Sequence, residues 1–292
     1  MQMLIRDAPL PLPLIRQDHV RDVYAVEGGH QLLVASDRIA VFGVVMHDPI
    51  PAKGVVVTAV SAFWFSKTAG LVRNHLVPAQ VLPEAARPYA EQLAGRWLLV
   101  RRVQRINLAC GVCGYLTSSA WDEYRRLGTV AGEPLPPGLL EAERLDRPRF
   151  RPVIPATDAG CEQTLSRTQL RRLLGGALAV RLEGASLCLY AAAEAYARQR
   201  GLLLAATTFT FGLLDGELLL IDELLSPDSS DYWPAEHYRP GGPQPGLGTQ
   251  SVRDHLLRSG WSKQPPPPPL PTTVVAATTA KYQEVLRRLV EQ

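Results

Sequence analysis

Carboxylates gather at the end of one predicted strand, where "ELLLIDELLSPDSS" passes from apolar residues into Asp222 and Glu223. Asp228, Ser229 and Ser230 follow shortly afterwards. Hard oxygen ligands of this kind suit Mg²⁺, which proteins hold with one or two carboxylates while substrate phosphates supply further ligands. Capped helices and solvated loops use the same residue types, so spacing alone leaves open both a metal–phosphate site and a structural role.

Two further polar clusters lie near predicted strand ends or beside glycine. "VRDVY" and "ASDR" contribute Arg21, Asp22, Asp37 and Arg38. "GYLTSSAW" contributes Ser119 directly after a glycine-containing segment. The sequence contains no GxxxxGK[ST] loop, no GxGxxG after a strand and no HExxH, so the common phosphate-binding and zinc motifs are absent.

Cys110 and Cys113 form a CxxC pair, a spacing found in redox and zinc sites. No second CxxC and no His-x-x-x-His accompanies them, which leaves a metal with two ligands. We therefore interpret these cysteines as small buried residues of an apolar segment.

The acid pair is positioned by a predicted hairpin, "ATTFTFGLLDGELLLIDE", that turns at Asp215-Gly216. Its first arm alternates apolar residues with threonine, which indicates one buried face and one polar but uncharged face. A second hairpin is predicted at Glu27-Gly28-Gly29.

Helical spacing is predicted over 57–72, 166–200 and about 278–290, with a short helix in "QSVRDHLLRSG". Ser166 and Gln169 form a candidate capping box. Residues 128–165 contain many Pro and Gly and are predicted to be loop-rich. The pattern indicates an α+β protein.

The bulk properties exclude several classes of function. A formal net charge of +3 over 292 residues does not indicate binding to nucleic acid. Charged residues interrupt the longest apolar stretch, 173–196, and the N-terminus lacks a cationic start with an apolar core, so neither membrane insertion nor secretion is expected. We predict a cytoplasmic protein.

Long motifs in a fixed order resemble the SAICAR synthetase family. They include "VRDVY", "SDRI", "PIPAKG", "SAFWF", "LPPGL", "FGLLDGELLLIDELLSPDSS", "YWPAEHYRPG" and the terminal "KYQEVLRRL". The resemblance implies an antiparallel β-rich N-terminal region, an α+β ATP-grasp-like region and C-terminal helices. We accordingly predict domains at 1–100, 101–245 and 246–292.

The resemblance also implies a reaction and a set of site residues. ATP with Mg²⁺ would activate the carboxylate of an aminoimidazole ribonucleotide as an acyl phosphate, and the amine of aspartate would attack it. The implied nucleotide contacts are Arg21, Asp22 and Lys53; the implied substrate contacts are Asp37, Arg38, Ser119 and Asp228; the implied Mg²⁺ ligands are Asp222 and Glu223.

Ten positions depart from the charged or polar residues that the resemblance leads us to expect. Cys113 and Asp231 each stand where an arginine is expected, and Thr208 stands where a lysine is expected. The full set is His19, Gly43, Ala109, Cys113, Ala156, Cys161, Ala206, Thr208, Thr210 and Asp231.

These departures lead us to expect a divergent enzyme acting on a purine-derived or aminoimidazole nucleoside or nucleotide. Specialised nucleoside pathways of the coformycin or pentostatin type would use such an enzyme. One alternative is a non-catalytic partner subunit that assembles with another pathway enzyme; the other is an ordinary ATP-dependent SAICAR synthetase. The family resemblance favours a homodimer, with ATP and Mg²⁺ as cofactors.

Overall fold

A four-stranded antiparallel sheet forms the N-terminal part of the chain. The computed structural model describes residues 9–155 and 162–291. The sheet has the order β1-β2-β3-β6, with bounds Leu14–Gln17, Arg21–Val26, His30–Ala35 and Trp97–Arg101. The predicted turn joins β2 to β3, where Gly28 and Gly29 have φ angles of 72° and 74° that favour glycine.

A second, larger sheet contains the predicted hairpin. Its order is β11-β10-β7-β12-β13, and β14 also pairs with β12. The bounds are β7 Gln104–Tyr115, β10 Arg144–Ile154, β11 Gln163–Thr164, β12 Leu202–Leu214, β13 Glu217–Ile221 and β14 Ser230–Pro234. The β12–β13 hairpin pairs Leu214 with Glu217 across Asp215-Gly216, which confirms the predicted turn.

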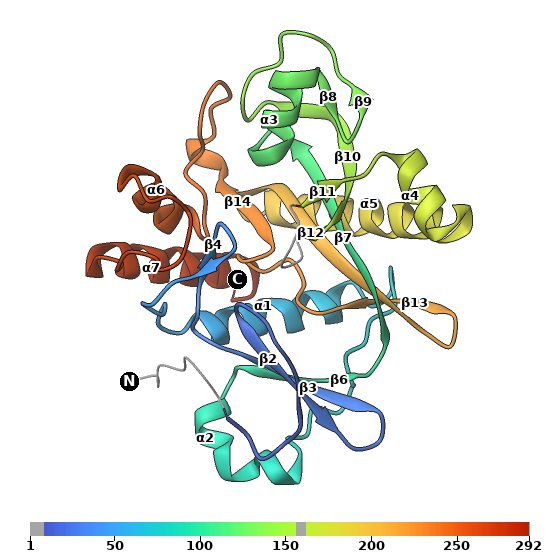
Figure 1. The fold of residues 1–292 in the computed structure, drawn as a ribbon, viewed down its shortest axis with the longest axis vertical. Coiled ribbons are helices and arrows are strands. Elements are labelled where there is room, and N and C mark those ends of the chain that lie inside the picture. Colours follow the sequence, from blue (N-terminus) through green and yellow to red (C-terminus); the bar gives the residue numbers. More distant parts are fainter. Residues whose placement is uncertain (1–8, 156–161, 292) are drawn as a thin grey trace.

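Five of the helices pack beside the two sheets (Figure 1). They are α1 Lys53–Lys67, α4 Arg167–Leu174, α5 Gly176–Arg198, α6 Gln250–Arg258 and α7 Thr272–Leu289. Helix α1 contacts β3 and β6 of the first sheet as well as α7, so the two ends of the chain meet across it. Ser166 and Gln169 form the predicted capping box of α4.

Helix α3 and several short elements complete the fold. Helix α3 covers Ser118–Leu127, and two-residue strands form the pairs β4–β5 and β8–β9. The remaining bounds are β4 Ala40–Val41, β5 Val44–Val45, β8 Thr129–Val130, β9 Glu133–Pro134, α2 Ala90–Leu93, and the 3₁₀ turns Glu84–Tyr89 and Ala235–His237.

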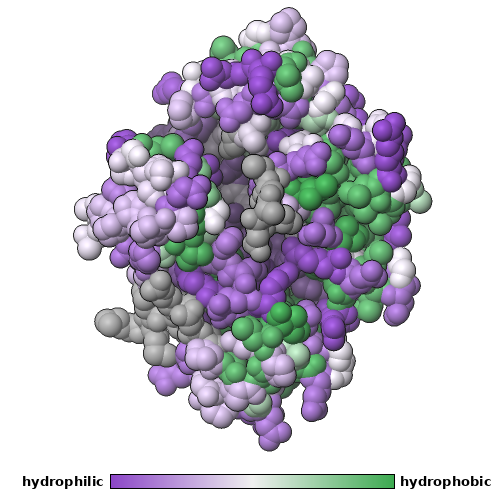
Figure 2. Space-filling model, in the orientation of Figure 1, coloured by the Kyte–Doolittle hydropathy of each residue, from purple (hydrophilic) through white to green (hydrophobic). Residues whose placement is uncertain are grey.

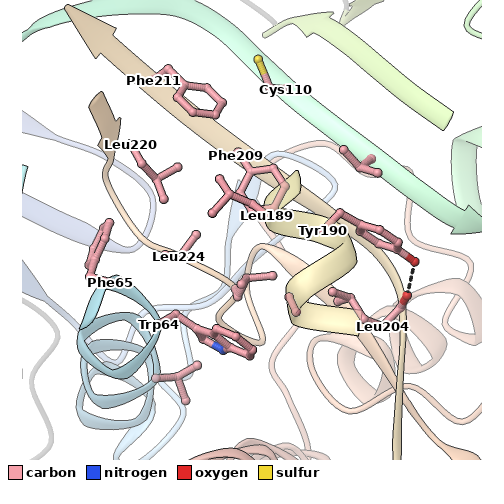
Figure 3. Close-up of a cluster of buried hydrophobic side chains, with 14 of the residues drawn as sticks. Trp64, Phe65, Cys110, Leu189, Tyr190, Leu204, Phe209, Phe211, Leu220 and Leu224 are labelled. Carbon is pink, nitrogen blue, oxygen red and sulfur yellow. Dashed lines mark hydrogen bonds between the residues drawn. The ribbon is translucent and has the colours of Figure 1, made fainter. Parts of the chain in front are cut away.

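The main core lies between the second sheet, α5 and α1. Phe209 and Phe211 point from β12 into this core with Trp64 of α1 and Leu189 of α5 (Figure 3). Threonine alternates with these phenylalanines, so Thr208 and Thr210 point to the opposite face of the strand. The alternation read from the sequence therefore separates core from site.

Two local predictions are wrong. Residues 128–165 are less loop-rich than predicted, because they contain the eleven-residue strand β10. Proline in β10 obscured the strand pattern, and a register shift between Arg144 and Arg149 accommodates Pro148. Helix α7 begins at Thr272, earlier than predicted, because it follows Pro271 directly.

Helix α5 has the length and composition of a membrane span, with a mean hydropathy of 1.2 in its most apolar window. It is the one such helix in 9–155 and 162–291. The charged residues that interrupt the stretch 173–196 therefore do not exclude it by composition. Core helices of globular proteins also meet this criterion. Leu182, Leu189 and Tyr190 of α5 are buried, and the helix packs against β7 and β12.

The predicted α+β class with antiparallel sheets is confirmed. The domain boundaries at residues 100 and 245 stay a prediction.

Candidate functional site

A cavity of 720 Å³ lies between the second sheet, the loop after β13, the start of α3 and helix α6. Figure 2 shows a hollow near the middle of one face, bordered by hydrophilic residues. The lining is predominantly polar and includes both carboxylates and arginines. Such a concave site with converging charged groups is the expected form of a small-molecule site.

Strand register explains which residues form the floor of this cavity. In antiparallel pairs, residues directly opposite one another project from the same face. Ala206 of β12 pairs with Cys113 of β7, and Thr208 pairs with Gly111. Asp231 of β14 pairs with Ala206 from the other side. Cys113, Ala206 and Asp231 thus form one row across three strands, and Thr208 lies on the same face two residues along β12. These four of the ten departing positions line the cavity, as does Thr210.

The predicted acid cluster lies at one end of the cavity. Asp222 has a φ angle of 67°, a left-handed conformation that ends β13 and turns the chain toward Glu223. Asp222 accepts hydrogen bonds from Arg16, at 3.2 Å, and from Arg105. Glu223 pairs with Arg21 at 3.1 Å. Each carboxylate at this end therefore already has a cationic partner.

Local charges set the ionisation of these carboxylates. Burial alone would raise the pKa of Asp222, but Arg21, Arg105 and Arg16 outweigh burial and lower the pKa to about 2. For Glu223, burial dominates over the attraction of Arg21 and raises the pKa. The two adjacent acids therefore differ in how readily they take up a proton.

Asp228 belongs to a buried chain of polar contacts behind the cavity. It accepts hydrogen bonds from Lys53 of α1 and from the hydroxyl of Tyr282 of α7. Lys53 and Tyr282 are each 1% exposed. A small void of 20 Å³, large enough for one water molecule, is bordered by Lys53, Asp228 and Glu223.

The carboxylates do not offer a ready coordination set for a resident Mg²⁺. Both oxygens of Asp222, Glu223 and Asp228 accept hydrogen bonds from protein donors. Among the described residues, no group of three His, Cys, Asp or Glu side chains could hold a metal ion. The assignment of Asp222 and Glu223 as metal ligands stays a prediction.

Three other predicted residues face away from the cavity. Asp22 pairs with Arg38 at 2.7 Å, and Asp37 accepts hydrogen bonds from the backbone N–H of Gly54 and from Arg96. The Asp37 contacts tie the loop after β3 to the start of α1. Asp22, Asp37 and Arg38 are all buried and are absent from the cavity lining in the described part of the chain.

The remaining predicted positions are distributed as follows. Arg21 and Ser119 line the cavity, and Lys53 borders the small void. His19, Gly43 and Ala109 do not line the cavity in the described residues. Ala156 and Cys161 lie outside the described residues.

The CxxC pair is buried, as predicted. Cys110 packs in the main core, whereas Cys113 packs with Leu116, Ala120 and Leu145 on the other face of β7. Burial raises the pKa of both thiols. Because the two sulfurs belong to opposite faces of the strand, they do not form a joint metal or redox site.

Comparison with known proteins decides the family. The model of the SAICAR synthetase family matches residues 14–268. The chain belongs to the SAICAR synthetase family.

Relatives match the chain along nearly its whole length. The phosphoribosylaminoimidazole-succinocarboxamide synthase of Desulfosudis oleivorans is 45% identical over 281 residues, which are 96% of each chain. The synthase of the same name from Syntrophotalea carbinolica is 43% identical and is matched over 95% of this chain and 94% of its own. A SAICAR synthase of Saccharomyces cerevisiae, solved in complex with SAICAR, has a TM-score of 0.90 at 36% identity and is matched over 98% of its length. The predicted SAICAR synthetase fold is confirmed.

The prediction of a divergent enzyme for specialised nucleosides is wrong. Relatives at 43–45% identity over nearly the full length carry the name of the ordinary synthase, and nothing connects this family member to nucleoside antibiotics. The prediction counted the charges missing at ten positions. It did not count Arg105, Arg151 and Arg253, which line the cavity from other positions.

Sequence reasoning missed these three arginines for different reasons. Arg151 belongs to β10, the strand that was predicted as loop. Arg105 has no local signal, because only its pairing with Gly212 of β12 places it beside the hairpin. Arg253 lies in "QSVRDHLLRSG", which the sequence analysis interpreted only as a short helix.

Proposed function

We propose that this SAICAR synthetase family member carries out the ordinary ATP-dependent ligation of aspartate to carboxyaminoimidazole ribonucleotide. The observation that carries the proposal is the match of 45% identity over 96% of both chains to a phosphoribosylaminoimidazole-succinocarboxamide synthase. The yeast relative solved with SAICAR supports the same product.

The reaction joins a carboxylate and an amine in two steps. The terminal phosphoryl group of ATP transfers to a carboxylate oxygen of the ribonucleotide, and ADP leaves. The aspartate amine then attacks the activated carbonyl carbon; the amine loses a proton, phosphate leaves and an amide forms. Mg²⁺ enters with ATP as part of the substrate.

The chain's own groups position the reactants and offset negative charge. Arg21, Arg105, Arg151 and Arg253 supply cations around a single cavity. Fixed cations of this kind stabilise phosphoryl and carboxylate charge without reorganisation during the reaction. Asp222 and Glu223 hold Arg105 and Arg21 in place.

Formation of both ADP and SAICAR tests the proposal. Purified protein is supplied with carboxyaminoimidazole ribonucleotide, aspartate and MgATP, and both products are separated by chromatography. We expect equal amounts of the two products, and no SAICAR when aspartate is omitted. Absence of SAICAR with the full set of substrates, in protein that is folded by circular dichroism, contradicts the proposal.

A matched pair of variants separates the cavity from the protein surface. Asp222→Asn removes the charge that holds Arg105 and Arg16, and we expect kcat/KM to fall about 10- to 100-fold. Glu217→Gln removes the partner of exposed Arg73 at the other end of the same strand and should leave kcat/KM unchanged.

Assembly and location follow as further proposals. A homodimer in the cytoplasm, with a small-molecule nucleotide as the ligand, is the arrangement that the family resemblance favours. Sedimentation at micromolar protein concentration tests the dimer.

A further inference from the structure

Arg151 lies on the floor of the cavity, on the strand beside Cys113. In the β10–β7 pairing, Arg151 is opposite Gly111 and Arg149 is opposite Cys113. Arg151, Gly111 and Cys113 therefore belong to one face of the sheet, the face that lines the cavity. The neighbouring floor residues Ala206 and Thr208 carry no charge.

The guanidinium of Arg151 uses little of its hydrogen-bonding capacity. Its one side-chain hydrogen bond to a described residue runs from Nη2 to the hydroxyl of Thr164, at 3.4 Å. Its Nε is buried without an acceptor, and it forms no ion pair with any described residue. Glu162 lines the same cavity but makes no ion pair with Arg151. Arginine offers five N–H donors, so most remain for a ligand.

Arg151 differs from similar arginines in the partners of its guanidinium. Six arginines in the described part of the chain have a buried Nε without an acceptor, and five of them have a partner elsewhere on the guanidinium. Carboxylates serve four of these: Asp222 for Arg16, Asp22 for Arg38, Asp37 for Arg96 and Asp146 for Arg149. Arg200 stacks 3.5 Å from the ring centre of Tyr196. Among the described residues, Arg151 has neither a carboxylate nor a ring as a partner.

A partly buried cation without a counter-ion is costly, because it gives up solvation and gains no attraction in return. Asp222 and Glu223 at one end of the cavity are already held by other arginines. Asp231 lies on β14, which is separated from β10 by β7 and β12. Small side chains at Gly111 and Thr208 leave space above the strand. A ligand anion seated there would provide the missing partner.

We infer that Arg151 binds an anionic group of the substrate, a carboxylate or a phosphate monoester, on the floor of the cavity. The inference deepens the proposed function and rests on it for the identity of the substrate. Arg151 would supply, from β10, a guanidinium of the kind that the resemblance led us to expect at position 113 on β7. The effect of Arg151 in lowering the pKa of the Cys113 thiol, against the larger effect of burial, is consistent with this closeness.

The test uses Arg151→Ala and Arg151→Lys, with Arg147→Ala as the matched control because Arg147 is an exposed arginine of the same strand. KM is measured separately for the ribonucleotide and for aspartate. Independently of activity, the rise in Tm caused by inorganic phosphate and by malonate is measured for each variant.

We expect Arg151→Ala to raise one of the two KM values about 10- to 100-fold and to lose the Tm rise given by the matching probe. A raised KM for the ribonucleotide together with a lost Tm rise from phosphate would identify a phosphate group. A raised KM for aspartate together with a lost Tm rise from malonate would identify a carboxylate. Arg151→Lys should be intermediate, because a single ammonium cannot reproduce the planar fork of arginine. Arg147→Ala should match the wild type.

Structural and binding roles differ in their effect on the free protein. Removal of a cation without a counter-ion should leave the Tm without ligand unchanged or raise it. If Arg151→Ala leaves both KM values within twofold and keeps the Tm rise with each probe, the inference is overturned, and a lower Tm without ligand would then indicate a structural role. It is also overturned if wild-type protein shows neither activity nor a Tm rise with either probe. If the protein is inactive but shows an Arg151-dependent Tm rise, the proposed function fails and the anion site stands.

Discussion

Lys53 donates a buried hydrogen bond to Asp228 across 175 positions of sequence. Lys53 opens helix α1, and Asp228 lies in the loop between β13 and β14. The side chain of Lys53 is 1% exposed and that of Asp228 is 10% exposed, so the pair has little contact with solvent. This ion pair fixes the first sheet's helix to the cavity end of the second sheet.

Removal of the lysine should be strongly destabilising. Lys53→Met leaves Asp228 buried without its cation, and we expect the free energy of unfolding to fall by about 3–5 kcal/mol. Urea denaturation measures this change. The exposed pair of Arg73 and Glu217 provides the control, since Arg73→Ala should cost at most about 1 kcal/mol. Equal losses in the two variants would contradict the burial argument.

The hydroxyl of Tyr282 should contribute through the same carboxylate. Tyr282→Phe removes a hydrogen bond to a charged acceptor, and we expect a loss of about 1.5–3 kcal/mol in urea denaturation. Tyr196→Phe removes a 3.0 Å hydrogen bond to the carbonyl of Leu289 at the end of the same helix. Because that acceptor is neutral, the control should lose only about 1 kcal/mol.

Buried His75 should make stability depend on pH. Its ring lies 5.4 Å from that of Phe65, and burial lowers its pKa from 6.5 to about 4. Between these two values the unfolded chain binds a proton that the folded protein excludes, so stability is full above pH 6.5 and falls as the pH drops toward 4. We expect His75 to account for a loss of about 3 kcal/mol over that window.

Urea denaturation across the same pH range checks this expectation. His75→Phe should flatten the dependence of unfolding free energy on pH, whereas replacement of the exposed His237 by Gln should not. An unchanged slope in His75→Phe would show that another group is responsible.

Substitution by alanine should have opposite effects on stability at two glycines, Gly114 and Gly184. A Cβ on Gly114 would lie 2.1 Å from the hydroxyl oxygen of Tyr190, which donates a hydrogen bond to the carbonyl of Leu204. Gly114→Ala should therefore cost about 1–3 kcal/mol. Gly184 lies in α5 with nothing within 4 Å of its added Cβ, so Gly184→Ala should stabilise the protein by up to about 1 kcal/mol. Thermal denaturation of both variants provides the measurement.

The local sequence pattern was sufficient to predict the β12–β13 hairpin and the position of its acid pair. The alternation of threonine with Phe209 and Phe211 and the Asp215-Gly216 turn predicted which residues leave the core. The capping box at Ser166 was visible for the same reason. Each of these features depends on residues only a few positions apart.

Features that depend on pairing between distant strands were not accessible in this way. Arg151 faces the cavity because β10 pairs with β7 in one particular register, and no local signal specifies that register. The alternation of side chains along a strand could have distinguished Arg21 from Asp22 as a cavity residue. Consecutive strand residues point to opposite faces, so only one of the two could face the cavity, and the structure places Arg21 there.

The contact between α1 and α7 bears on how the protein matures during synthesis. Domains generally begin to fold from the N-terminal side as the chain leaves the ribosome. Lys53 and Arg21 emerge long before their partners Asp228 and Glu223, and Tyr282 emerges last. Until then Lys53 lacks its carboxylate partner, and Arg21 has only Asp18. Ligand-binding competence should appear abruptly, only when almost the entire polypeptide is available, and a nascent fragment ending before α7 should be a natural substrate for chaperones.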